Sequence, residues 1–252
     1  DARRVADRLG IPFYAIDFSA DFRPIIDGFV GEYTRGRTPN PCVQCNQHLK
    51  FGSLFRKVRG LGAQILATGH YAKIEFNETQ NRHELKKGHD PLKDQSYFLY
   101  SMSKDTLPHV WFPLGGLRKS EVRDLARKYR LNTAEKQESQ DICFVPEGGY
   151  KQFLEDRLGK EAMAPGPFVD QDGKIVGQHK GIAYYTIGQR DKLGLALGYP
   201  VYVYKIDKET NSVHVGLLDK LYAPGLVASQ MNYVSIEGPV QTLPVQARIR
   251  YN

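Results

Sequence analysis

Apolar residues recur at helix and strand spacings along the first half of the chain. Spacings of three and four residues predict helices over residues 2–9 and 21–34, and Gly10 follows the first one as a helix stop. Between them, the run FYAIDF at residues 13–18 is rich in aromatic and β-branched side chains and predicts a strand. A further strand is predicted within QILATGHYAKI, residues 64–74. This alternation of strands and helices favours a mostly parallel sheet covered by helices.

Polar and turn-forming residues separate these elements. Residues 35–46 are rich in Gly, Arg, Thr and Pro and predict a loop, which is followed by a helix that ends at Gly60 and Gly62. Residues 71–88 predict an inserted hairpin that turns at NETQN. Ser120 is the expected N-cap of a later helix.

The pattern changes after Gly148. A helical segment, YKQFLEDRLG, precedes two predicted hairpins with polar turns, GPFVDQDGKIVGQHKG and PVYVYKIDKETNSVHVG. From about Leu226 the chain predicts short strands that are interrupted by prolines.

Both ends of the sequence suggest a fragment. A parallel α/β sheet normally begins with a strand, whereas this chain begins with a predicted helix. We therefore expect the first strand and its phosphate-binding loop to precede Asp1. The strand pattern also stops at Tyr251 and Asn252, so we interpret the sequence as cut at both ends.

Composition changes this picture mainly through charge. The 252 residues contain 35 Lys and Arg against 28 Asp and Glu, which gives a formal net charge of +7. Such a surplus favours a polyanionic partner through counterion release, although dispersed basic residues also fit solvated helix faces. The sequence has no apolar run near the roughly 20 residues of a membrane span and no secretory signal. We expect a soluble cytoplasmic protein without membrane contact.

The three cysteines argue against a secreted disulfide scaffold. Cys42 and Cys45 form a C-x-x-C pair behind two prolines, where a neighbouring thiol and a helix N-terminus favour the thiolate. The pair alone fits a redox pair, half of a metal site or coincidence, and a closed zinc site would need four ligands. The third cysteine, Cys143, lies between Ile142 and Phe144 and is either a buried strand residue or a partner thiol.

Three further motifs carry polar side chains. In ATGHYA, Gly69 and His70 follow a predicted strand, and the carboxyl ends of parallel strands line the ligand crevice of an open sheet. A lone histidine is otherwise more often a structural hydrogen-bonding group. KDQSYFLY also fits a plain helix cap, and TIGQR alone is a loop with a cationic side chain.

Five motifs together resemble one family, the tRNA-specific 2-thiouridylases. GRTPNPCVQCNQHLKFG, ATGHYA, KDQSYFLY, ESQDICFV and HKGIAYYTIGQR occur in that family's order and at about its spacings. The resemblance implies an α/β domain of the ATP-pyrophosphatase type (adenine nucleotide hydrolase-like) with a parallel sheet over residues 1–147. It also implies a small central domain over residues 148–225 and the start of a C-terminal β-barrel over residues 226–252.

The same resemblance implies ATP-dependent 2-thiolation of the tRNA wobble uridine. ATP, with Mg, would adenylate the uracil 2-oxygen, and a persulfide on Cys143 would deliver the sulfur. Cys45 would be the other catalytic thiol, a nucleophile that can form a disulfide with Cys143. The other implied site residues are Asn40, Pro41 and Cys42 at the target base, Gly69 at ATP, and His70, Lys93, Asp94, Gln95, Arg250 and Tyr251 at the tRNA. The implied partners are tRNA and a sulfur-donor protein, either a persulfide relay or a cysteine desulfurase, and no permanent metal is expected.

The sequence departs from the family pattern in three places. Cys42 stands where many members have Asp, and Asp191 and Lys192 stand where the family usually has Lys and Gly. The S-G-G-x-D-S phosphate loop does not occur in these residues, so we expect them alone to be inactive. An alternative from another class is an iron–sulfur protein ligated by Cys42, Cys45 and Cys143. A non-catalytic RNA-binding module is a third interpretation.

Overall fold

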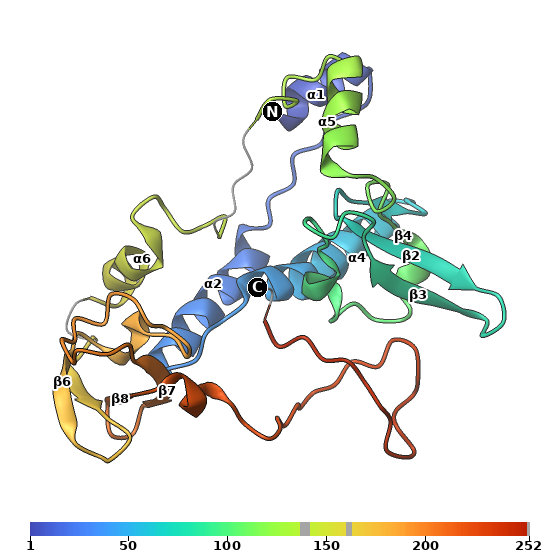
Figure 1. Ribbon diagram of the computed structural model, residues 1–252. Coiled ribbons are helices and arrows are strands. Elements are labelled where there is room, and N and C mark those ends of the chain that lie inside the picture. Colours follow the sequence, from blue (N-terminus) through green and yellow to red (C-terminus); the bar gives the residue numbers. More distant parts are fainter. Residues whose placement is uncertain (137–141, 160–162, 251–252) are drawn as a thin grey trace. The chain divides into compact units, whose positions relative to one another are not determined.

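The computed structural model describes residues 1–136, 142–159 and 163–250 (Figure 1). The chain divides into two compact units. Unit 1 comprises Asp1–Phe22, Cys42–Ser139 and Gln230–Asn252, and unit 2 comprises Arg23–Pro41 and Gln140–Ser229. Each unit buries an apolar core of its own.

The two helices predicted near the N-terminus are confirmed. α1 spans Ala2–Leu9, and Gly10 ends it with a left-handed φ of 66°; α2 spans Ser19–Thr34. The strand predicted over residues 13–18 is wrong, because no strand of the described residues pairs with this stretch and Tyr14 is 80% exposed. Aromatic and β-branched residues favour a strand only where a neighbouring strand is present. In the part of the chain that the structure describes, no helix is long and apolar enough to cross a membrane.

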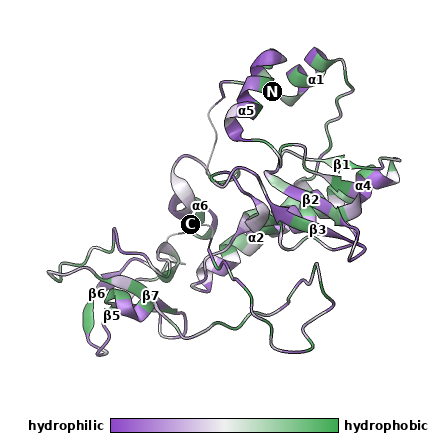
Figure 2. Ribbon diagram, turned by 45° about the vertical axis from the view of Figure 1, so that its right-hand side comes forward, coloured by the Kyte–Doolittle hydropathy of each residue, from purple (hydrophilic) through white to green (hydrophobic). Residues whose placement is uncertain are grey.

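α1 and α5 (Lys119–Lys128) lie side by side in unit 1, as both views show (Figures 1 and 2). The prediction that Ser120 caps α5 is wrong. Arg118 occupies the N-cap position, and its N–H donates a hydrogen bond of 2.6 Å to the carboxylate of Glu121. The carboxylate of Glu121 thus accepts the hydrogen bond from the backbone N–H of the N-cap residue, as in a capping box.

Unit 1 contains a parallel strand pair and a hairpin. β1 (Leu66–Ala67) pairs in parallel with β4 (Val110–Trp111), so the predicted parallel pairing is present, although it is short. β2 (Ala72–Asn77) and β3 (Arg82–Lys87) form the predicted antiparallel hairpin. The helical elements between Pro41 and His109 are α3 (Pro41–Gln44), η1 (Cys45–Leu54), α4 (Phe55–Gly60), η2 (Ser96–Leu99) and η3 (Leu107–His109). The buried core of unit 1 consists of Phe51, Ala72, Leu99, Met102, Leu107, Val110 and Phe112.

Unit 2 is organised around a four-stranded sheet with the strand order β6-β5-β8-β7. The two predicted hairpins are confirmed as the antiparallel pairs β5–β6 and β7–β8, and β5 and β8 join them in parallel. The bounds are α6 (Gly149–Leu158), β5 (Gly166–Val169), β6 (Ile175–His179), η5 (Ile182–Tyr184), β7 (Tyr202–Asp207), β8 (Ser212–Gly216) and η6 (Leu218–Leu221). Apolar side chains of the sheet, including Phe168, Val203 and Val213, share one core with Phe29 and Tyr33 of α2.

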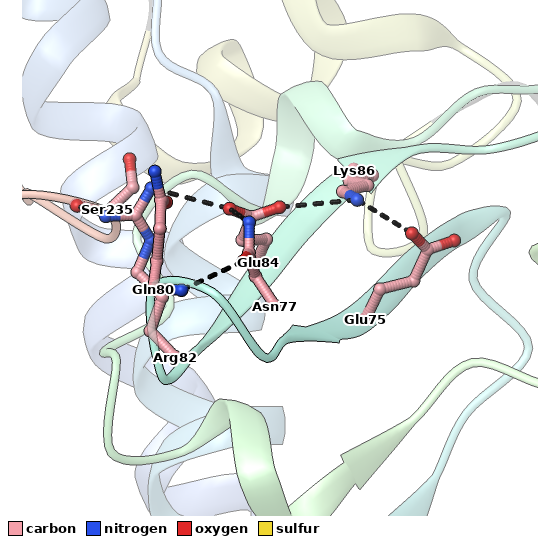
Figure 3. A network of polar contacts seen from close by, with 7 residues as sticks. All are labelled: Glu75, Asn77, Gln80, Arg82, Glu84, Lys86 and Ser235. Atoms are coloured by element: carbon pink, nitrogen blue, oxygen red, sulfur yellow. Dashed lines mark hydrogen bonds and ion pairs between the residues drawn. The ribbon is translucent and has the colours of Figure 1, made fainter.

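The C-terminal segment of unit 1 is held by side-chain contacts instead of strand pairing. The short strands predicted from Leu226 are wrong, because residues 226–250 contain no strand. Asn232 Nδ2 donates hydrogen bonds of 2.7 Å to the carbonyl oxygens of Tyr100 and Met102. Arg82 donates to the carbonyl oxygen of Ser235, at one end of a polar network along the hairpin (Figure 3). The side chain of Asn232 and the main-chain oxygen of Ser235 thus attach the segment to unit 1 without forming a sheet.

Candidate functional site

Cys42 and Cys45 lie on a helix, and not on the loop that the sequence predicts. Helical structure begins with α3 at Pro41 and continues through η1 and α4. Proline suits the first helical position because the N–H that it lacks would have no helical partner there. Cys42 therefore sits in the first helical turn, where the helix dipole favours a thiolate. Cys42 is exposed, and Cys45 is half-buried.

η1, which starts at Cys45, is a π-helix, and glycine permits its wide turns. The N–H of Phe55 reaches the carbonyl oxygen of Lys50, five residues earlier. A Cβ atom on Gly52 would lie 2.9 Å from the carbonyl oxygen of Gln47, so a larger residue would have to distort the turn. π-helical turns are rare and occur frequently at functional sites. The second cysteine thus stands where a regular helix becomes a widened one.

Asn46 connects this helix with the segment that contains KDQSYFLY. Its side chain is 2% exposed, and its Nδ2 donates a hydrogen bond of 2.9 Å to the carbonyl oxygen of Phe98 in η2. The Oδ1 atom of Asn46 is buried and accepts no hydrogen bond from the residues that the structure describes. An unpaired buried acceptor costs about 1–3 kcal/mol. A donor from a bound ligand would recover this free energy.

Asp94 and Gln95 hold the backbone before η2 in place. The Asp94 carboxylate is 5% exposed and accepts hydrogen bonds from Ser96 N (3.2 Å), Ser96 Oγ (2.8 Å) and Gly88 N (2.9 Å). The Gln95 N–H donates to the Tyr71 carbonyl oxygen at 2.9 Å, and the Tyr71 N–H donates to Gln95 Oε1 at 3.1 Å. Both side chains are therefore engaged inside unit 1, and the positive charge of the motif comes from its lysine.

Gly69 follows β1 and has free space beside it. A Cβ atom there would meet only Leu114, at an ordinary contact distance of 3.7 Å. The packing of the described residues therefore does not require glycine at this position. Close approach of a ligand to the backbone is a separate reason for a glycine.

His70 is a buried and uncharged side chain. It is 9% exposed, its ring lies 5.9 Å from the ring of Phe51 and 5.6 Å from that of Phe112, and its Nδ1 lies 2.7 Å from Thr68 Oγ1. Burial, with a smaller contribution from the positive charge of Lys50, lowers the pKa of His70 to about 4. The imidazole is therefore neutral at neutral pH. It can form a hydrogen bond with a ligand but adds no positive charge.

The residues before Arg250 lie against η2. The Tyr97 hydroxyl donates a hydrogen bond of 3.3 Å to the carbonyl oxygen of Ile249, and the Arg248 guanidinium lies 5.9 Å from the centroid of the Tyr97 ring. The structure thus brings the region of Arg250 to the region of Lys93, although the two are far apart in sequence. Tyr251, the other residue expected to meet tRNA here, lies outside the described residues.

Cys143 belongs to unit 2 and is exposed. It lies in a turn in which the Val145 N–H donates a hydrogen bond of 2.9 Å to the Ile142 carbonyl oxygen. The two neighbouring side chains face the core of unit 2, and the Phe144 ring lies 5.2 Å from that of Phe29. The interpretation of Cys143 as a buried strand residue is therefore wrong. Apolar neighbours fix the turn and leave the thiol accessible.

Contacts of η2 connect the motifs of unit 1. Asn46 links it to the C-x-x-C helix, Gln95 links it to Tyr71 beside the ATGHYA turn, and Tyr97 links it to the C-terminal segment. The sequence analysis did not identify Asn46 or Tyr97 as residues of the site. The available signals were that Asn46 directly follows the C-x-x-C pair and that Tyr97 lies within KDQSYFLY. Among the described residues, no group of three or more His, Cys, Asp or Glu side chains is arranged to hold a metal ion.

Comparisons with known proteins cover both units. Residues 1–147 match the family model described as the tRNA methyl transferase HUP domain, and residues 151–217 match that of the tRNA methyl transferase PRC-barrel domain. A HUP domain is an α/β domain of the ATP-pyrophosphatase type, so the predicted fold class is confirmed.

Curated relatives match the chain over its whole length. The tRNA-specific 2-thiouridylase MnmA of Carboxydothermus hydrogenoformans is 50% identical over 253 residues, which cover 100% of this chain and 69% of the relative. The protein of the same name from Geobacter metallireducens is 52% identical over 252 residues, covering 100% of this chain and 68% of the relative. That of Geotalea uraniireducens is 49% identical, and the chain spans 66% of it. The chain therefore belongs to the family of tRNA-specific 2-thiouridylases, which are tRNA-modifying sulfurtransferases.

Proposed function

We propose that this protein uses ATP to convert the wobble uridine of tRNA into 2-thiouridine. The observation that carries the proposal is the convergence on η2 of the C-x-x-C helix, the ATGHYA turn and the C-terminal basic segment. In the proposed reaction the uracil 2-oxygen attacks the α-phosphorus of ATP and releases pyrophosphate. The adenylated oxygen then leaves as AMP, which is a far better leaving group than the uracil oxygen itself.

Cys143 carries the transferable sulfur as a persulfide in this proposal. Its outer sulfur attacks C2 of the adenylated uridine, so that a C–S bond forms and AMP departs. The thiolate of Cys45 then attacks the Sγ atom of Cys143, breaks the S–S bond and leaves the sulfur on the base. The two cysteines end as a disulfide, which two external thiol groups reduce with two electrons, becoming a disulfide themselves, before the next cycle. The exposure of Cys143 supports loading by a donor protein, either a persulfide relay or a cysteine desulfurase.

The remaining residues would bind and orient the two substrates. Asn40, Pro41 and Cys42 would line the flipped target base, because they lie three to five residues before Cys45. The open space beside Gly69 supports close approach of the adenine nucleotide, whose phosphates Mg would accompany. Lys93, Arg250 and Tyr251 would contact tRNA, with His70 as a neutral hydrogen-bonding group. Asp94 and Gln95 would shape this surface through their internal hydrogen bonds. The cytoplasm, where thiols stay reduced, is the proposed location.

A single-turnover assay tests the proposal. The complete protein, including any residues that flank these 252, is incubated with ATP, a persulfide donor and unmodified tRNA, and 2-thiouridine is measured by nucleoside mass spectrometry. Cys143→Ser should abolish the product and leave tRNA affinity within about twofold, because a hydroxyl cannot carry a persulfide and no phosphate contact is lost. Normal product formation by Cys143→Ser would show that Cys143 is not the sulfur carrier.

A second variant separates this scheme from iron–sulfur chemistry. Cys42→Asp should still produce 2-thiouridine by the persulfide route, since many sequences that the chain resembles have Asp at this position. A cluster ligated by Cys42, Cys45 and Cys143 would lose a thiolate ligand and its activity. Iron and sulfide analysis of anaerobically purified protein provides an independent readout. Stoichiometric iron and sulfide, together with an inactive Cys42→Asp, would favour the cluster.

A further inference from the structure

Unit 2 carries a basic cluster around two adjacent tyrosines in the motif HKGIAYYTIGQR. The ammonium group of Lys151 lies 5.7 Å from the ring centroid of Tyr184 and 5.9 Å from that of Tyr185. Both tyrosines are buried at the base of the cluster, and Lys151 itself is half-buried. The two aromatic faces thus fix the position of one positive charge.

Two further lysines approach Lys151 from other elements. The backbone of Lys180 hydrogen-bonds with the hydroxyl group of Tyr185, which places this residue beside the same ring. Burial, and then repulsion by the charges of Lys192 and Lys180, lowers the pKa of Lys151. The side chains of Lys180 and Lys192 are exposed. The charges of Lys180 and Lys192 therefore act on Lys151 and repel its ammonium group.

Two described carboxylates of this region, Glu155 and Asp191, have other partners. Glu155 accepts a hydrogen bond of 2.6 Å from the Tyr184 hydroxyl, and Asp191 pairs with Arg190 at 3.3 Å. The ion pairs found among the described residues, which in unit 2 are those of Arg35, Arg37, Arg157, Arg190 and Lys205, do not involve any lysine of the cluster. An external anion would therefore relieve the repulsion.

Lys192 is held in an unfavourable backbone conformation. Its φ of 60° is left-handed, which suits glycine and is uncommon for a lysine. The sequences that the chain resembles usually have glycine at this position. Strained conformations concentrate at functional sites, because the surrounding structure must hold them in place. Lys192 thus adds a positive charge at a position where a lysine backbone is strained.

We propose that Lys151, Lys180 and Lys192 form a phosphate-binding site that holds the sugar–phosphate backbone of the tRNA substrate. The proposal rests on the proposed function for the identity of the anion. A surface of exposed lysines suits the RNA backbone, which presents its phosphates on the outside, and the chain has a net charge of +7. These contacts would position the tRNA without reading its sequence.

Salt-dependent tRNA binding tests the site with two variants that preserve the fold. Lys192→Gly removes a charge and also relieves the strained φ, and Lys151→Met keeps an unbranched apolar stem on the tyrosine rings. Each should reduce the slope of log affinity against log salt by about 0.7–0.9, which corresponds to roughly sixfold weaker binding at 0.1 M salt. Lys174→Met, in the exposed turn between β5 and β6, is the matched control and should leave the slope unchanged.

Chemical footprinting provides a second readout that needs no substitution. Acylation of lysines, followed by mass spectrometry, should show that tRNA protects Lys151 and does not protect Lys174. Millimolar ATP should not protect Lys151, and protection by ATP alone would assign the site to a nucleotide and overturn the proposal. If wild-type protein binds tRNA and the cluster variants behave like Lys174→Met, this inference fails while the proposed function stands. Absence of tRNA binding by wild-type protein would contradict the proposed function itself.

Discussion

The surroundings of Cys45 and of Cys143 are built from opposite kinds of side chain. Cys45 is half-buried beside Asn46, in a unit that also buries His70 and Asp94. Cys143 is exposed in a turn of unit 2, and its neighbours Ile142 and Phe144 pack on an apolar core. One thiol thus adjoins a buried polar side chain, in a unit that buries further polar groups, and the other is presented by apolar neighbours.

This difference sets what each region tolerates. A buried polar group is stable only while it keeps its hydrogen-bond partners, and the buried imidazole of His70 is neutral, so unit 1 should respond to pH and to the loss of single hydrogen bonds. Apolar packing is less directional, and the turn of Cys143 should depend mainly on the volume of its neighbours. A protected nucleophile in unit 1 and an accessible sulfur carrier in unit 2 fit the two roles proposed for these thiols.

The largest expected effect is an acid-induced loss of stability in unit 1. The pKa of His70 is about 4 in the folded protein and about 6.5 in the unfolded chain. The unfolded chain therefore takes up the proton first, so the contribution is fully present above pH 6.5 and is lost as the pH falls through 4. A difference of about 2.5 units corresponds to about 3 kcal/mol. Urea titrations at pH 7 and pH 4, followed by fluorescence of the single Trp111 in β4, measure this loss.

A His70→Gln variant isolates the contribution of the histidine from that of the carboxylates, which also titrate in this range. The amide stays neutral, so the variant should lose about 3 kcal/mol less than wild-type protein between the two pH values. Equal pH dependence of the two proteins would show that His70 is not protonated more readily after unfolding.

A smaller effect is expected for Asn46→Ala. The substitution removes the hydrogen bond of 2.9 Å to the Phe98 carbonyl oxygen but also removes the unpaired Oδ1. The free energy of unfolding should therefore fall by about 1 kcal/mol, and Cys45 should become more accessible. Asn77→Ala is the control, since its partner Glu84 lies in the surface network of Figure 3 and its loss should cost less than about 0.5 kcal/mol. Equal costs would mean that Asn46 does not support the helix of Cys45.

The smallest effect concerns the thiols of the native protein. Exposed Cys42 and Cys143 should be alkylated by iodoacetamide at least about threefold faster than half-buried Cys45, because access limits the reaction. Peptide mass spectrometry at short reaction times measures the three rates, and unfolding in urea should make them similar. Fastest alkylation of Cys45 would instead indicate that stabilisation of its thiolate outweighs its burial, and the contrast between the two thiols would then be one of charge.

Local sequence patterns predicted the elements that short-range forces determine. The helix over residues 21–34 and the hairpin over residues 71–88 are present because periodic apolar positions and turn residues act within each segment. The strand predicted over residues 13–18 failed because a strand needs a partner, which the segment itself cannot supply. The prolines within residues 35–46 suggested a loop, although Pro41 in fact stands at the first position of a helix, where proline is also favoured.

The sequence by itself determined the family, the fold class and the set of chemically active residue types, because motif order and composition are properties of the chain alone. Only the tertiary structure decided which of these side chains face inward. Asp94 and Gln95 have no sequence feature that distinguishes internal hydrogen bonds from contact with a ligand, and Asn46 differs from Asn77 only in what packs around it. Burial and hydrogen bonding depend on residues distant in the chain, so the exposure of Cys143 and the neutrality of His70 follow only from the folded surroundings.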